Sequence, residues 1–125
     1  MEENEISKII IGAAIKIHRK LGPGLLESAY EECMAYELTN ENLQIERQKS
    51  IPLIYERIII NNAYKADIIV EDKVLIELKS VENVLNVHKA QLLTYLNFSN
   101  KKLGLLINFN SELLKNGIIR VVNKL

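Results

Sequence analysis

Two acidic residues and one lysine interrupt otherwise apolar stretches in the middle of the sequence. Residues 64–70 contain one acid, Asp67, and residues 74–80 contain Glu77 and Lys79 after three apolar residues. Side chains of a β-strand alternate between its two faces, so Glu77 and Lys79 are predicted to share a face. Carboxylates and an ammonium group that meet on one face can bind a cation or move a proton.

The position of Asp67 relative to Glu77 depends on how the two predicted strands pair. The connection between them, residues 71–73, is three residues long. If it pairs Val70 with Val74, Asp67 lies directly opposite Glu77 and on the same face. A shift of one residue in this register would separate the two acids, so the predicted acidic site is conditional on the pairing.

Two expected helices each add one polar residue to an apolar stripe. At helical spacing, Glu27 lies in line with Tyr30, Met34 and Leu38, and Gln91 lies in line with Val84, Val87, Tyr95 and Phe98. Apolar neighbours of this kind are predicted to turn both polar groups inward. Two simpler interpretations stay open: Glu27 is an ordinary first-turn acid favoured by the helix dipole, and Gln91 bonds a backbone group.

A divalent cation is the simplest partner for these acids. Glu27, Asp67 and Glu77 together would leave two uncompensated negative charges beside Lys79, and buried charges are costly unless they are paired. Oxygen ligands without His or Cys suit Mg²⁺ or Mn²⁺. The implied chemistry is metal-assisted phosphodiester hydrolysis, in which Lys79 orients or deprotonates the attacking water. The competing interpretation is a structural ion pair formed by Lys79 with one of the acids.

The candidate residues lie on two of three predicted helices and on a predicted β-meander. Helical periodicity predicts helices over residues 2–20, 25–40 and 84–99. β-branched and alternating residues predict strands over 44–50, 51–60, 64–70, 74–80, 102–109 and 117–123. This order predicts an α/β fold with a mixed β-sheet, in which an antiparallel meander is flanked by helices.

Composition limits the function classes. The 125 residues predict one domain, and 16 basic against 16 acidic residues give no global field to attract a polyanion, so a nucleic-acid site must be local. The five glycines form no phosphate-binding loop or dinucleotide fingerprint. One cysteine, an acidic N-terminus and no long apolar run predict a cytoplasmic protein without a membrane segment.

Three motifs together resemble a known family. Asp67 followed by Glu77-Leu78-Lys79 resembles the D…(D/E)xK signature of the PD-(D/E)xK nuclease superfamily. The run from Gln91 to Tyr95 is similar to the QxxxY motif of its exonuclease-like branch, and the run from Gly24 to Tyr30 resembles the pattern of the small prokaryotic GxxExxY family of that superfamily. The resemblance implies one PD-(D/E)xK nuclease-like core over residues 1–125.

The resemblance also implies roles for single residues. Asp67 and Glu77 are implied to be metal ligands, Lys79 the catalytic lysine, and Glu27 and Gln91 supporting site residues. The predicted function is a Mg²⁺- or Mn²⁺-dependent nuclease acting on DNA, with RNA as the alternative substrate and a homodimer as the expected way to grip a duplex. The alternative is a non-catalytic module that binds nucleic acid or protein and retains the nuclease fold.

Overall fold

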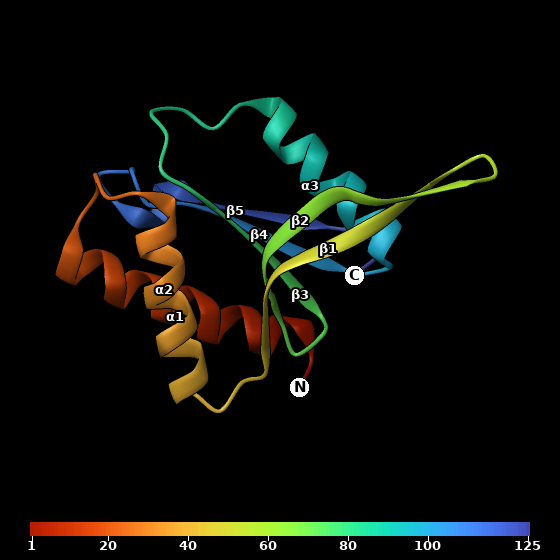
Figure 1. The fold of residues 1–125 in the computed structure, drawn as a ribbon. Coiled ribbons are helices and arrows are strands. Elements are labelled where there is room, and N and C mark those ends of the chain that lie inside the picture. The colour runs from red at the N-terminus through yellow and green to blue at the C-terminus, as the bar shows by residue number, and fades with distance from the viewer.

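A computed structural model describes residues 1–125 as three helices and a five-stranded mixed sheet (Figure 1). In chain order the elements are α1 (Glu3–Leu21), α2 (Glu27–Asn40), β1 (Ile45–Tyr55), β2 (Ile58–Val70), β3 (Val74–Lys79), α3 (Asn86–Ser99), β4 (Leu103–Asn108), the short 3₁₀ helix η1 (Leu114–Gly117) and β5 (Ile118–Val122). The predicted α/β class is therefore confirmed. None of the helices is both long and apolar enough to cross a membrane.

The corner between α1 and α2 is built around Tyr30. Its hydroxyl donates to the carbonyl of Gly22 at 2.5 Å and accepts from the N–H of Leu25 at 3.2 Å. Gly22 and Gly24 have φ values of 70° and 103°, a left-handed region that favours glycine. The second helix begins at Glu27, two residues later than predicted, because Leu26 is still extended. This corner sets where the first turn of α2 lies.

The β1–β2 hairpin differs from the predicted meander. The three stretches 44–50, 51–60 and 64–70 form two long strands, whose tight turn contains Glu56 and Arg57. Pro52 does not end β1, because β1 is the edge of the sheet and an edge strand tolerates a missing N–H donor. The pairing register shifts at this proline instead. Figure 1 shows the far end of the hairpin extending away from the helices.

Sheet pairing confirms the register on which the acidic site depends. The strand order is β1-β2-β3-β4-β5, with β3 and β4 parallel and every other pair antiparallel. Val70 pairs with Val74, which is the pairing on which the predicted site was conditional, and the ladder continues to Ile68 opposite Ile76. The next residues along the two strands are Asp67 and Glu77. The two acids thus lie where the β2–β3 ladder ends.

Helices cover both faces of the sheet. Helices α1 and α2 pack on one face in the larger apolar cluster, whose fully buried members include Ile10, Met34 and Ile76. On the other face α3 packs through Leu92 and Leu96. The predicted inward stripe of α3 is wrong, because Val87 and Phe98 are 54% and 46% exposed. Large apolar residues occur all around this helix, so periodicity alone could not identify its buried side.

Candidate active site

Asp67 lies between the ends of β2 and β3. Its Oδ2 accepts a hydrogen bond from the backbone N–H of Leu78 at 2.8 Å. The last backbone pair of the β2–β3 ladder is Ile68 with Ile76. Just beyond this pair, the Asp67 side chain takes the place of a backbone acceptor for β3. The Asp67 backbone also lies close enough to Glu77 to lower the pKa of its carboxyl group. The two predicted acids are therefore neighbours at the end of the ladder.

The strict alternation of faces does not continue through Asp67. Ala66 and Ile69 are three residues apart, yet both pack in the cluster beneath α3, whereas Ile68 packs with α1 and α2. On β1, Gln48 has a φ of 50°, and no Gln48–Asp67 pair is present in the β1–β2 ladder. The carboxylate of Asp67 is directed toward Gln48 and α2. Strict alternation along a regular strand therefore does not determine where the Asp67 side chain lies, and its hydrogen bonds with Gln48 and Leu78 do.

Glu77 is half-buried, and its carboxyl group is difficult to ionise. Burial raises its pKa to about 7, although Lys79 and the Asp67 backbone lower it, and the charges of Glu27 and Glu31 raise it further. The Tyr64 hydroxyl donates a hydrogen bond to Glu77. The Tyr64 ring stacks on Tyr95 of α3. Helix α3 therefore reaches the site through Tyr95.

Asp67 is perturbed in the same direction. Burial raises its pKa, the hydrogen bonds from Leu78 and Gln48 lower it, and the charge of Glu31 raises it. Two neighbouring acids with raised pKa values are typical of sites in which the negative charge is compensated only by a ligand.

Lys79 is half-buried at the end of β3 and forms no ion pair or side-chain hydrogen bond within the chain. Its positive charge still reaches both acids, because it lowers the pKa of Glu77 and of Asp67. The structural ion pair considered from the sequence is absent. The Lys79 ammonium group is thus free to bind an anionic substrate.

The two helical predictions have different outcomes. Glu27 is exposed, but its Oε2 accepts from the backbone N–H of Ser80 at 3.2 Å, directly after Lys79. Gln91 is exposed on α3 and makes no hydrogen bond to any of the other predicted site residues. The inward orientation predicted for both side chains is wrong. Glu27 lies in the exposed first turn of α2, and Gln91 lies on the face of α3 that points away from the sheet. No three Asp, Glu, His or Cys side chains form a group that could hold a metal ion.

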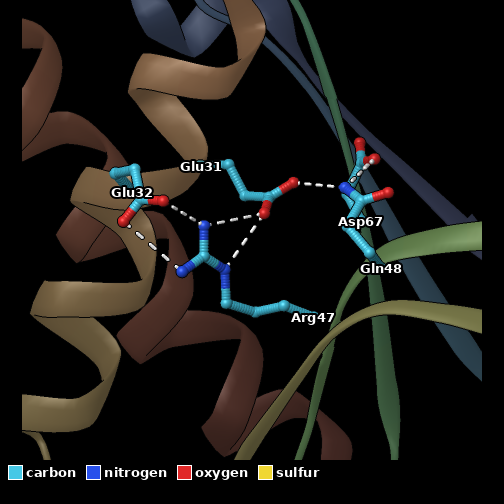
Figure 2. Close-up of polar contacts among 5 residues, drawn as sticks. All are labelled: Glu31, Glu32, Arg47, Gln48 and Asp67. Carbon is cyan, nitrogen blue, oxygen red and sulfur yellow. Dashed lines mark hydrogen bonds and ion pairs between the residues drawn. The ribbon is translucent and has the colours of Figure 1, made fainter.

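Sequence reasoning missed a polar network beside Asp67, which Figure 2 shows. Glu31 is 8% exposed and lies between Arg47 and Gln48 of β1. Glu31 follows Glu27 by one helical turn, so helical spacing could have indicated it. Arg47 and Gln48 could not be placed, because the continuity of the hairpin was not predicted.

The comparisons with known proteins give the family of the chain. The family model described as the PD-(D/E)XK nuclease superfamily matches residues 4–121, and the chain belongs to that superfamily. No curated protein and no solved structure gives a significant match to the chain. The match includes part or all of every element of the fold; α1 begins one residue before it and β5 ends one residue after it.

Proposed function

We propose that the chain is a metal-dependent nuclease that hydrolyses phosphodiester bonds of DNA, with RNA as the alternative substrate. One observation carries the proposal: Asp67 and Glu77, both with raised pKa values, lie beside the unpaired ammonium group of Lys79. Membership in a nuclease superfamily adds the reaction class. A site of this kind needs a cation and an anionic substrate to balance its charges.

Asp67 and Glu77 would hold a Mg²⁺ or Mn²⁺ ion. Mg²⁺ is usually bound through one or two carboxylates together with water and substrate phosphate, so two acids are sufficient protein ligands. The donor set contains oxygen only, which suits a hard cation. When bound, the cation supplies positive charge to the scissile phosphate and lowers the pKa of a bound water.

The remaining groups bind and orient. Lys79 would orient or deprotonate the attacking water and stabilise the charge that develops on the phosphate. Glu27 accepts from Ser80 and so fixes the end of the strand that carries Lys79. Gln91, exposed on α3, keeps its predicted supporting role with an amide that is free to contact substrate. Glu77 must lose its proton before it can hold a cation.

A comparison of three variants tests the proposal. Lys79→Ala should abolish cleavage of DNA in Mg²⁺ or Mn²⁺ and leave Mn²⁺ affinity nearly unchanged, because lysine is not a ligand for these ions. Asp67→Ala should remove both cleavage and Mn²⁺ binding. Lys8→Ala, an exposed lysine of α1, serves as the control and should change neither. Nuclease assays and isothermal titration with Mn²⁺ give the two readouts.

Two results would contradict these roles. Equal loss of Mn²⁺ affinity in Lys79→Ala and Asp67→Ala would show that Lys79 supports the fold of the site rather than the reaction. Binding of DNA without cleavage of DNA or RNA would favour the non-catalytic binding module. Such binding should weaken steeply with salt if it depends on phosphate contacts. The zero formal net charge gives no global field to attract a polyanion, which motivates this non-catalytic alternative with protein rather than nucleic acid as its ligand.

We also propose that the chain belongs to the GxxExxY branch and acts in the cytoplasm. The spacing of Gly24, Glu27 and Tyr30 supports the branch, since Tyr30 holds the corner that places Glu27 next to Ser80. The single cysteine supports a reducing compartment.

A homodimer completes the proposal. The outer end of the β1–β2 hairpin exposes five large apolar side chains: Ile54, Tyr55, Ile58, Ile59 and Ile60. Glu56 and Arg57 in its turn form no ion pair within the chain. In a two-fold contact Glu56 of one copy can face Arg57 of the other, and Arg57 of the first copy then faces Glu56 of the second. These two adjacent opposite charges therefore suit a second copy of the chain.

A further inference from the structure

Gln48 has a strained backbone in the middle of a strand. Its φ of 50° lies in the left-handed region, which non-glycine residues seldom adopt. The residues on either side of it are paired normally, Arg47 with Ile68 and Lys49 with Ala66. Strain of this kind persists only where the surrounding structure holds it in place, and it is common at functional sites. Its effect here is to turn Gln48 out of the ladder, toward α2.

The turned side chain lies between two carboxylates. Its Nε2 donates to Oε1 of Glu31 at 2.5 Å and to Oδ1 of Asp67 at 3.3 Å. Carboxylates accept hydrogen bonds, so an amide between two of them must present its NH₂ group, whose two hydrogens serve one acid each. Gln48 is exposed and the Glu31 carboxylate is largely buried, so the buried acid fixes the more mobile amide.

Arg47 fixes Glu31 in turn. Its guanidinium donates to Oε2 of Glu31 through Nε at 3.0 Å and lies 2.7 Å from Oε1 of Glu32. Both acids are on α2, so one arginine of β1 fastens the strand to the helix (Figure 2). Oε2 of Glu31 is bonded to Arg47, and Oε1 is left to accept from Gln48. The contacts form a continuous chain from Arg47 to Asp67.

We propose that Gln48 is a positioning residue that fixes the orientation of the Asp67 carboxylate, and that Glu31 and Arg47 hold Gln48 in place. The inference rests on the proposed function, in which Asp67 is a metal ligand. Each oxygen of Asp67 has one protein donor, Gln48 on Oδ1 and Leu78 on Oδ2. The lone pairs that remain point away from these donors, and they set the direction from which a cation is bound. Donors behind a ligand commonly tune metal affinity in this way.

The strained backbone allows a sharp test with Gln48→Gly. Glycine adopts positive φ readily, so this variant should melt at the same temperature as the wild type or higher. Loss of the amide should weaken Mn²⁺ binding roughly tenfold or more in isothermal titration. The matched control is Glu56→Gly, at a φ of 53° in the hairpin turn, which should leave Mn²⁺ affinity unchanged. A purely structural role for Gln48 predicts the reverse: a lower melting temperature and unaltered affinity.

A measurement without metal separates failure of this inference from failure of the proposed function. In nuclear magnetic resonance spectra of the metal-free protein, the Gln48 side-chain NH₂ should be shifted and protected from exchange. Arg47→Met should return it toward the position of a free glutamine. If the wild type and Gln48→Gly bind Mn²⁺ with equal affinity, the inference about Gln48 is overturned. The proposed function is not affected by that result.

If the wild type binds no Mn²⁺, the proposed metal site is wrong. The inference about Gln48 is then tested by its side-chain NH₂ resonance alone. A protected Gln48 amide that depends on Arg47 supports the positioning of Asp67, and a free amide overturns it.

Discussion

The two halves of the β1–β2 hairpin use the same pair of strands in different surroundings. The inner half, residues 45–51 with 64–70, lies between α2 and α3 and carries Gln48 and Asp67. The outer half, residues 53–62, has no helix over it and exposes its isoleucines. Polar side chains are thus fixed by tertiary contacts in one half, while apolar side chains lack such contacts in the other. The two halves have the same strand pairing and differ in burial. The half covered by helices forms the candidate site, and the uncovered half is an exposed apolar surface.

Matched truncations of two isoleucines on β2 should give the largest difference between the halves. Ile68 is fully buried and Ile59 is 64% exposed. Ile68→Ala should lower the free energy of unfolding by about 2–5 kcal/mol through lost burial and a cavity, whereas Ile59→Ala should change it by no more than about 0.5 kcal/mol. Denaturant unfolding measures both values. At concentrations where the chain is monomeric, similar losses would contradict the difference in burial between the two halves.

Glu77, on β3 next to the inner half, should make stability depend on pH. The pKa of Glu77 is raised from 4.5 to about 7, so folded protein holds this proton more tightly than unfolded protein. The stabilisation is therefore complete below about pH 4.5 and is lost as the pH rises through about 7, by roughly 3 kcal/mol. Glu77→Gln should remove this component. The difference in unfolding free energy between wild type and variant, measured from pH 4 to 8 in EDTA, should follow that course; a difference independent of pH would exclude it.

Substitutions in the outer half should have the smallest effect on stability. Their effect is measured instead on the association of two copies of the chain. Ile58→Thr with Ile59→Thr keeps β-branched residues in the strand and removes two exposed apolar side chains. Light scattering at increasing concentration should give a dimer for the wild type and a monomer for the double variant, with unfolding nearly unchanged. A monomeric wild type, or a variant that still dimerises, contradicts the proposed contact.

The sequence was sufficient where local rules determine the geometry. The three-residue connection allowed the pairing of Val70 with Val74, and the structure has this pairing, which brings Asp67 next to Glu77. The presence of α1 and the buried stripe of Tyr30, Met34 and Leu38 on α2 followed from helical spacing alone.

The remaining features depend on tertiary context. Pro52 is harmless only because β1 is an edge strand, and strand order is not visible in local sequence. Helix α3 offered apolar residues on several sides, so its buried side is chosen by the sheet. Gln48 reaches Glu31 only through a left-handed backbone, a conformation that its residue type does not predict.

The central claim is that Asp67 of the inner half and Glu77 of β3 bind a cation beside Lys79, and melting curves with Mn²⁺ test it most directly. At pH 8 in EDTA, Glu77→Gln should melt above the wild type, because it removes a charge that burial disfavours. Mn²⁺ at a hundredfold excess over its dissociation constant should stabilise the wild type by roughly 2.7 kcal/mol and the variant very little. A wild type indifferent to Mn²⁺, together with a variant that melts lower in EDTA, would contradict the account.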